Sequence, residues 1–389
     1  MNKKRFFIMC ALTLLCTLTI STKVKAIQYT DEMQYTESKM ILASKIRDNT
    51  VNRNKSFSVL AKITYDKPVD IDILNNYADN LVKLAMSEEL ANSSSAGDYL
   101  KYSWDEYKKN ISGYYSSSYS KYNYYLTITY KFTYYTTYNQ EQKLNKDVLA
   151  YISKNVNKND TDLSKISMIY NYISKSVKYN KNIGDIKYSA YSAYENKTAI
   201  CQGYSTLLYK MLKEADIDEV RVIRSATHSW NIVKIGNKYY HLDTTWEATT
   251  SKKGNYNYFL KGSNEINKLN QHKIDSEYKT KKFKKEYPIS NEDYMKTSIT
   301  KIKNVKNKKA KINWKENIYC DGYVIEYSTK KNFKNSKKNI ISNRYTSKKT
   351  IKGLKKNTKY YVRIRTYKKI NNKRNYFTWS NTRIIKTTK

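Results

Sequence analysis

The sequence predicts an α+β protein that ends in an all-β unit, and three observations predict this class. Between residues 70 and 215, several segments carry apolar residues at helical spacing. Residues 220–243 then contain short segments rich in β-branched and aromatic residues. Beyond residue 310 only strand signals occur, at a regular spacing that favours a β-sandwich. A length of 389 residues is enough for two or three domains.

The first 26 residues have the pattern of a secretory signal peptide. Three basic residues at 3–5 precede the apolar stretch 6–20, and the small residue Ala26 offers a cleavage point. The apolar stretch is about 15 residues long, whereas a membrane-spanning helix needs about 20, so cleavage is favoured over a membrane anchor. We therefore expect a secreted, extracellular protein with no transmembrane segment after cleavage.

Residues 27–139 are expected to form a small α+β unit. Apolar residues recur at helical spacing over 70–90, and the small and polar residues at 93–97 interrupt the pattern. Residues 124–135 alternate and are rich in aromatic and β-branched side chains, which predicts a strand.

Residues 140–271 are expected to form the next domain, with helices before strands. The predicted helices are 140–156, 162–179 and 199–215, and Asp160 or Thr161 can cap the second one. Gly236 and Asn237 form a turn signal between the last two predicted strands. The predicted strands are 220–223, 229–235 and 238–243.

Residues 272–300 are rich in lysine and poor in apolar residues, so we expect a basic linker there. Residues 301–389 are expected to form the sandwich. Its predicted strands are 310–314, 323–328, 339–342, 350–351, 360–367 and 382–387.

The net charge of +39 is concentrated in the C-terminal region. Residues 301–389 carry 28 Lys and Arg against three acidic residues, Glu316, Asp321 and Glu326. A field this positive attracts polyanions and is screened by salt. Outside a cell, anionic cell-wall polymers or glycans are the expected partners, and nucleic acid is less expected. A solvated face that keeps the protein soluble is the alternative.

The mature chain would keep two cysteines, Cys201 and Cys320. A disulfide between them is disfavoured because they lie in different expected domains. Cys201 stands at a predicted helix start, where unpaired backbone N–H groups and partial positive charge favour the nucleophilic thiolate. Gly203 lets another backbone or a substrate come close. The alternative is a buried cysteine that acts as a small hydrophobic residue.

His228 and Asp243 are the expected partners of this cysteine. A two-residue turn at Gly236 and Asn237 places residue 228 opposite residue 245, so that Asp243 is a diagonal neighbour of His228 on the same face. The carboxylate can then orient the imidazole, which can stabilise a thiolate and protonate a leaving amine. His241 shares this face and is an alternative base, whereas His272 is expected to be solvated in the linker.

Motifs for metal or nucleotide chemistry are missing from the sequence. No His/Cys cluster has metal-ligand spacing, and no glycine-rich loop could hold a phosphate. We therefore expect neither a metal nor a cofactor.

The three segments that carry these residues resemble the transglutaminase-like superfamily of papain-related cysteine enzymes. They read Cys-Gln-Gly-Tyr from residue 201, His-Ser-Trp-Asn from 228 and Leu-Asp-Thr-Thr-Trp from 242, and the similarity covers roughly residues 144–260. The resemblance implies that Cys201 is the nucleophile, His228 the base and acid, and Asp243 the orienting residue. The sequence departs from many members at Thr244, where Pro is frequent, and at Ser229, where Ala is common.

The resemblance leaves the oxyanion partner open. The backbone N–H of Cys201 would be one donor. The side-chain candidates for oxyanion or substrate contacts are Gln202, Tyr194, Trp230 and Trp246.

Residues 301–389 resemble a fibronectin type III domain of the kind repeated in Gram-positive surface proteins. The resemblance is carried by segments 311–314, 322–327, 360–365 and 379–380, with Leu354 between them. It implies that Trp314 fills the core and that a tyrosine after Leu354 makes a corner hydrogen bond. It indicates a fold and says little about a ligand.

Two functions are compatible with these patterns. The first is a secreted cysteine acyl-transfer enzyme that acts on peptide or glutamine-type amides and passes the acyl group to water or to an amine. The second is a non-catalytic surface adhesion protein that reuses the same fold as a binding module.

Overall fold

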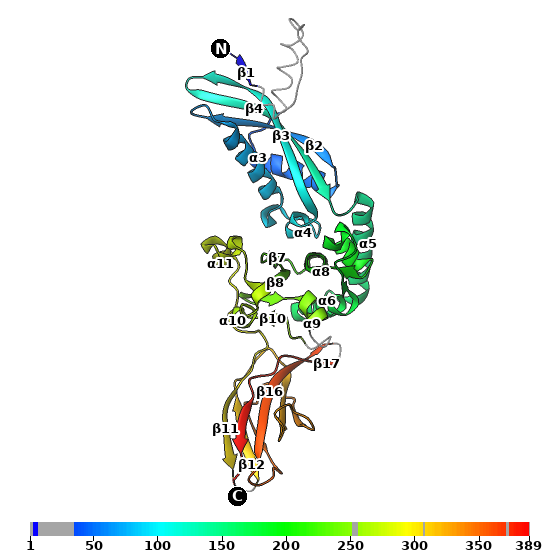
Figure 1. Cartoon of the computed structure of the whole chain (residues 1–389), viewed down its shortest axis with the longest axis vertical. Coiled ribbons are helices and arrows are strands. Elements are labelled where there is room, and N and C mark those ends of the chain that lie inside the picture. Colours follow the sequence, from blue (N-terminus) through cyan, green and yellow to red (C-terminus); the bar gives the residue numbers. More distant parts are fainter. Residues whose placement is uncertain (1–2, 7–34, 251–255, 306–307, 371–372, 389) are drawn as a thin grey trace.

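The computed structural model describes residues 3–6, 35–250, 256–305, 308–370 and 373–388. An N-terminal sheet, a central unit and a C-terminal β unit follow one another along the long axis of the molecule (Figure 1). The expected cleavage point after Ala26 lies outside the described residues. Within the described ranges, no helix is long and apolar enough to cross a membrane.

The N-terminal unit is an antiparallel sheet with helices packed against it. Helices α2 (Lys39–Val51) and α3 (Ile71–Ala85) share one buried apolar cluster with the sheet. The side chain of Asp70 caps α3 by accepting a hydrogen bond from the backbone of Ile73. Two short helical turns follow, η1 (Glu88–Leu90) and α4 (Asp98–Lys101). The strand order is β1 (Lys3–Phe6), β3 (Trp104–Ser118), β4 (Lys121–Tyr134) and β2 (Ser56–Tyr65).

The central unit places helices on a four-stranded sheet. Helix α8 (Cys201–Glu214) contacts strands β7 and β8, and its residues 202–212 are all buried. The N-cap of α6 (Asp162–Ser176) is Thr161, not Asp160. The other helices are α5 (Tyr138–Asn155), η2 (Asp185–Tyr188), α7 (Ala190–Tyr194) and α9 (Thr244–Thr250). The sheet order is β10 (Phe259–Lys261), β9 (Lys238–Leu242), β8 (Ser229–Ile235) and β7 (Val220–Arg224), and a separate parallel pair joins β5 (Lys178–Tyr179) to β6 (Thr198–Ala199).

The segment after β10 belongs to the central unit, so the prediction of a basic linker over 272–300 is wrong. Tyr278 and Tyr287 are buried in one cluster with Trp230 and Tyr239 of the sheet. The lysines of this segment lie outside, while aromatic side chains spaced between them pack inward, and overall composition hides this arrangement. The segment contains α10 (Ser263–Ile266), η3 (Asn270–His272), η4 (Ser276–Lys279) and α11 (Lys281–Glu286).

The C-terminal unit consists of two antiparallel sheets, as expected. Trp314 is buried between them, and the hydroxyl of Tyr360 accepts a hydrogen bond from the backbone N–H of Lys355 at 2.9 Å, which is the expected corner contact. One sheet has the order β11 (Ile299–Val305), β12 (Lys309–Trp314) and β15 (Lys348–Ile351). The other has the order β14 (Lys337–Ile341), β13 (Gly322–Ser328), β16 (Lys359–Ile370) and β17 (Lys373–Tyr376), and β18 (Arg383–Lys386) also pairs with β16.

Candidate active site

Cys201 is the first residue of α8 and is partly exposed. The preceding residue, Ile200, has no polar side chain, so it does not cap the first backbone N–H groups of the helix. Cys201 and Cys320 are both free thiols, and they do not form a disulfide. Cys320 is buried and donates a hydrogen bond to the carbonyl of Asn317 at 3.1 Å, so it is the cysteine that acts as a small core residue.

Gly203 is required for close packing at the start of this helix. A Cβ atom at this position would lie 2.7 Å from the Cβ of Ala199 and 2.8 Å from the carbonyl oxygen of Ser189. The sequence left open whether backbone or substrate approaches Gly203, and the structure shows backbone there.

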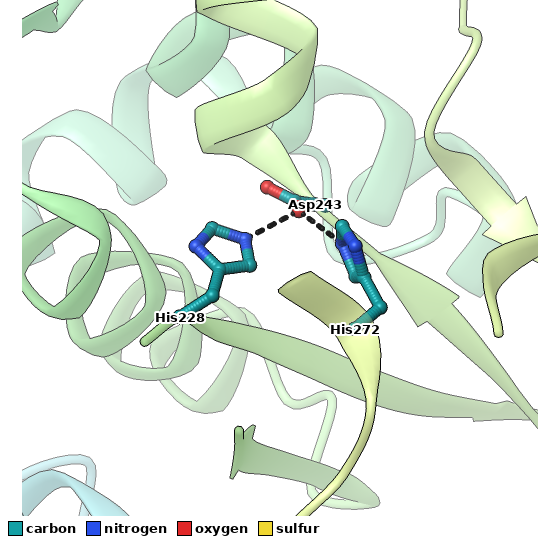
Figure 2. A group of neighbouring side chains, drawn as sticks. All are labelled: His228, Asp243 and His272. Carbon is teal, nitrogen blue, oxygen red and sulfur yellow. Dashed lines mark hydrogen bonds and ion pairs between the residues drawn. The ribbon is translucent and has the colours of Figure 1, made fainter. Parts of the chain in front are cut away.

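His228 and Asp243 are joined directly by a hydrogen bond (Figure 2). His228 stands just before β8 and Asp243 just after β9, and the β8–β9 register pairs Ile235 with Lys238, as the turn signal predicts. The distance from His228 Nε2 to Asp243 Oδ2 is 2.7 Å. The other carboxylate oxygen, Oδ1, accepts the backbone N–H of Trp246 at 2.9 Å and so also caps the start of α9.

Electrostatics favour the charged forms of this pair. Burial lowers the pKa of His228, but the charge of Asp243, their hydrogen bond and the interaction with Cys201 together raise that pKa well above its ordinary value. Burial alone would raise the pKa of Asp243, but His228 and then the hydrogen bond from His272 hold it far below the usual range. The second ring nitrogen of His228, Nδ1, points away from Asp243 (Figure 2) and is left for the sulfur of Cys201.

His272 is the third member of the group formed with His228 and Asp243, and the sequence did not indicate its participation. Its side chain is fully buried, and its Nε2 lies 2.7 Å from the same Oδ2 atom of Asp243 (Figure 2). The expectation that His272 is solvated is therefore wrong, because its segment folds back onto the sheet. The rings of Trp230 and Trp246 flank it, each with a centroid 4.7 Å away.

The three groups have the donor types of a metal site, and their ligand atoms lie within 4.8 Å of one another. The Nε2 atoms of His228 and His272 each lie 2.7 Å from Oδ2 of Asp243, a distance typical of hydrogen bonds. The arrangement is accounted for by these hydrogen bonds.

His241 does not serve as the alternative base in this arrangement. Its Nδ1 accepts a hydrogen bond from Trp230 Nε1 at 3.0 Å. Burial, and then the proximity of His272, lower its pKa to about 3, so the ring is neutral. The carboxylate of Asp243 is bonded to His228 and His272 instead.

The four side-chain candidates for oxyanion or substrate contacts differ in where the structure places them. Gln202 donates to the carbonyl of Tyr102 at 3.0 Å, and the hydroxyl of Tyr194 donates to the carbonyl of Asp147 at 3.0 Å, so both are engaged elsewhere. Trp230 is buried and stacks on His228 with a centroid distance of 5.6 Å. Trp246 lines a cavity beside His228.

This cavity has a volume of about 480 Å³ and is lined by His228, Trp246 and Tyr179 among others. Tyr179 is a residue that the sequence did not single out. It lies on β5 and pairs with Ala199, two residues before Cys201. Burial, then the charge of Cys201 and that of Tyr188, raise the pKa of the Tyr179 hydroxyl. The cavity therefore opens beside the imidazole of His228, and Tyr179, one of its lining residues, interacts with Cys201.

Comparison with protein families agrees with this architecture. The family model of the transglutaminase-like superfamily matches residues 150–244, a range that includes Cys201, His228 and Asp243. The model of the fibronectin type III domain matches residues 298–379. The chain thus contains a transglutaminase-like domain and a C-terminal fibronectin type III domain, and the expected fold class is confirmed.

Several solved structures that resemble part of the chain are fibronectin type III domains. The chicken CNTN1 FN1–FN3 structure is 20% identical, covers 23% of this chain and 30% of its own, and has a TM-score of 0.20. The FN3 domain of human contactin 1 is 12% identical over 24% of this chain and 77% of its own, with a TM-score of 0.20. The FN5 domain of Drosophila Lar is 18% identical over 24% of this chain and 95% of its own, also at 0.20. The chain spans less than a third of the first of these structures. A search of curated proteins found no match.

Proposed function

We propose that this protein is an exported cysteine acyl-transfer enzyme that acts on peptide or glutamine-type amide bonds. One observation carries the proposal: a hydrogen bond of 2.7 Å fixes His228 on Asp243 while the opposite side of the ring is left to the partly exposed Cys201. A structural histidine would not need a buried carboxylate on one side and a thiol on the other. This combination is typical of an activated nucleophile.

The first half of the reaction follows from these positions. The sulfur of Cys201, acting as a thiolate beside the imidazolium of His228, attacks the carbonyl carbon of the amide and forms a C–S bond. His228 Nδ1 gives its proton to the nitrogen, the C–N bond breaks, and ammonia or an amine leaves. Asp243 stays ionised and keeps the ring in place.

The negative charge on the carbonyl oxygen needs donors. The backbone N–H of Cys201 lies at the uncapped start of α8 and supplies one. The hydroxyl of Tyr179 is the side-chain candidate for another, because Tyr179 lines the cavity beside His228 and pairs with Ala199, two residues before Cys201. If so, Tyr179→Phe lowers kcat about tenfold or more with little change in KM, and an unchanged kcat would remove Tyr179 from this role.

The second half resolves the thioester. Water or an amine attacks the acyl carbon, His228 Nδ1 takes the proton of the attacker, and the thiolate leaves. Water gives hydrolysis and an amine gives transamidation, and the same three groups serve both outcomes. The signal pattern at residues 1–26 and the basic C-terminal unit support action outside the cell, at or near an anionic surface.

The test measures both outcomes at once. Reduced protein is incubated with casein and a fluorescent primary amine, and amine incorporation, ammonia release and cleavage are followed. We expect at least one signal from the wild type, a loss of about a thousandfold or more in Cys201→Ala, and retention in the matched variant Cys320→Ala.

A wild-type protein with a reduced Cys201 and none of the three signals would contradict the enzyme assignment. Retention of the full rate in Cys201→Ala would contradict the assigned nucleophile.

A further inference from the structure

A second cavity is lined by Gln202, the residue that follows Cys201. It has a volume of about 680 Å³, within the range of ligand sites, and lies between the N-terminal unit and the central unit. Tyr188 also lines it and interacts with Tyr179, which lines the His228 cavity. We call this second cavity the interdomain cleft.

Direct contacts between the two units fix the walls of the interdomain cleft. Asp98 of α4 accepts two hydrogen bonds from Arg221 of β7, at 2.7 and 2.9 Å, and a third from the backbone of Val222. Lys101 pairs with Glu277 at 3.0 Å. The cleft is therefore preorganised, and a ligand need not order its walls on binding.

The polar groups left over in the interdomain cleft are donors. Its three carboxylates are engaged: Asp98 with Arg221, Glu277 with Lys101, and Asp105 with the hydroxyl of Tyr135. Arg224, by contrast, lies over the ring of Tyr102 at 5.3 Å, and its Nε atom is buried without a hydrogen-bond partner. In the described part of the chain, no acidic side chain pairs with the Arg224 guanidinium, and Trp104 Nε1 is likewise buried without a partner.

Unpaired donors beside aromatic walls match an anionic group on a chain that also has apolar surface. The ring of Trp104 and those of Tyr107, Tyr135 and Tyr188 line the interdomain cleft. An arginine fork suits a carboxylate, and a buried donor that lacks a partner is costly until a ligand supplies one.

We propose that the interdomain cleft binds an acidic segment of the peptide substrate next to the reacting amide, with Arg224 pairing to a carboxylate of that segment. This inference rests on the proposed function, because a peptide substrate is expected only if Cys201 acts on peptide or glutamine amides. It gives the N-terminal unit a role in selecting the substrate.

The test measures binding without chemistry, in the full chain carrying Cys201→Ala. Two fluorescein-labelled nonapeptides with a central Gln are compared by anisotropy at 0.15 M NaCl, one with Glu on both flanks and one with Ser in the same places. We expect tighter binding of the Glu peptide, and about a tenfold loss of its affinity in Arg224→Gln. Affinity for the Ser peptide should not change.

Matched variants distinguish peptide binding in the interdomain cleft from binding caused by the general positive charge of the protein. Lys238→Gln removes one charge at an exposed position of the central unit and should leave both affinities unchanged. Trp104→Phe keeps the ring but removes its N–H, and it should weaken the Glu peptide about threefold, which provides a second measurement if Arg224→Gln does not fold. Thermal unfolding checks each variant.

Equal affinities of the two peptides, or an equal loss in Lys238→Gln and Arg224→Gln, would overturn the proposal. So would Arg224-dependent binding of heparin in the absence of peptide binding, since the interdomain cleft would then be a glycan site. Peptide binding by the Cys201→Ala protein, combined with an inactive wild type, would instead refute the enzyme function alone.

Discussion

At the residue scale, the most informative side chain is His272. Its Nδ1 is buried without a hydrogen-bond partner, whereas its Nε2 bonds to Asp243. With a proton on Nε2, the ring donates to the carboxylate, and Nδ1 lies buried on the opposite side of the ring. His272 is therefore a hydrogen-bond donor to Asp243. It acts through Asp243 and is a positioning residue, not a catalytic one.

The role of His272 predicts a shift in the pH profile. His272→Phe removes the donor but fills the space between the two tryptophans, and we expect kcat to fall about tenfold with little change in KM. The hydrogen bond from His272 helps to lower the pKa of Asp243, so its loss raises that pKa. The acid limb of kcat/KM should then move to higher pH. His272→Gln restores an N–H donor and should restore the profile; a profile that His272→Phe leaves unchanged would show a purely structural role.

The reactivity of the two thiols distinguishes the enzyme from the adhesion protein. The raised pKa of His228 keeps its imidazolium through mildly acidic and neutral pH, beside Cys201. Cys320 is buried, and burial raises the pKa of its thiol. Iodoacetamide at pH 6 should therefore label Cys201 about a hundredfold faster than Cys320, as measured by peptide mass spectrometry. His228→Gln should remove most of the difference, and equally slow labelling of both thiols in the wild type would favour the non-catalytic alternative.

At the element scale, the site residues that lie in one hairpin or at one helix start could be predicted from the sequence. The site residue that comes from a segment distant in sequence could not. The turn at Gly236, whose φ is 63°, sets the register that brings His228 to Asp243, and both lie in one hairpin. The start of α8 follows from its apolar pattern. His272 reaches the same carboxylate only because the segment after β10 folds back, and no pairing rule connects residues 243 and 272 from sequence. Strand β3 escaped prediction because Lys109 and Gly113 stand at inner positions beside Ile111, so the sequence shows no apolar alternation although the burial alternates over residues 107–113.

The packing of α8 on its neighbours predicts a measurable cost for Gly203→Ala. The added Cβ would meet Ala199 and the carbonyl of Ser189 at less than 3 Å, and backbone cannot move as a side-chain tip does. We expect a loss of about 1–3 kcal/mol in the free energy of unfolding, measured in urea. Because the helix start carries Cys201, kcat should fall as well. In the control Gly184→Ala, the added Cβ meets no atom within 4 Å, so only its φ of +65° costs stability, about 1 kcal/mol, and kcat should persist. Equal kcat values for the two variants would contradict this coupling.

At the scale of the whole molecule, the three units are joined by side chains far apart in sequence. Asp98 and Arg221 join the N-terminal unit to the central unit, and the ring of Phe377 lies 5.2 Å from that of Tyr256 where the fibronectin type III domain meets the centre. The sequence predicted the units from their own periodicities. The sequence did not predict these contacts between units, because each is an isolated contact with no repeating pattern. The interdomain cleft could not be predicted either, because it exists only where two units meet.

The charge of the C-terminal unit predicts salt-sensitive binding to an anionic polymer. Two of its three acidic residues, Asp321 and Glu326, are already paired with Lys368 and Arg363, so most of its lysines have no acidic neighbour within the unit. If this surface holds the protein to a wall polymer or glycan, the affinity must depend on where positive charge is removed. If the charge only keeps the protein soluble, the affinity for the polymer would not depend on where positive charge is removed.

Two variants of equal net charge test this. One replaces five exposed lysines of the C-terminal unit with Gln, and the other replaces five exposed lysines of the first 300 residues. The first set is Lys348, Lys349, Lys352, Lys355 and Lys356, and the second is Lys131, Lys146, Lys154, Lys158 and Lys238. On immobilised heparin, the first variant should elute at a lower NaCl concentration, and its log Kd should depend on log salt with a slope shallower by about one for each lysine that contacts the polymer. The second should behave like the wild type. Equal shifts in both variants would mean that the polymer responds to total charge, and the C-terminal unit would then have no special part in surface binding.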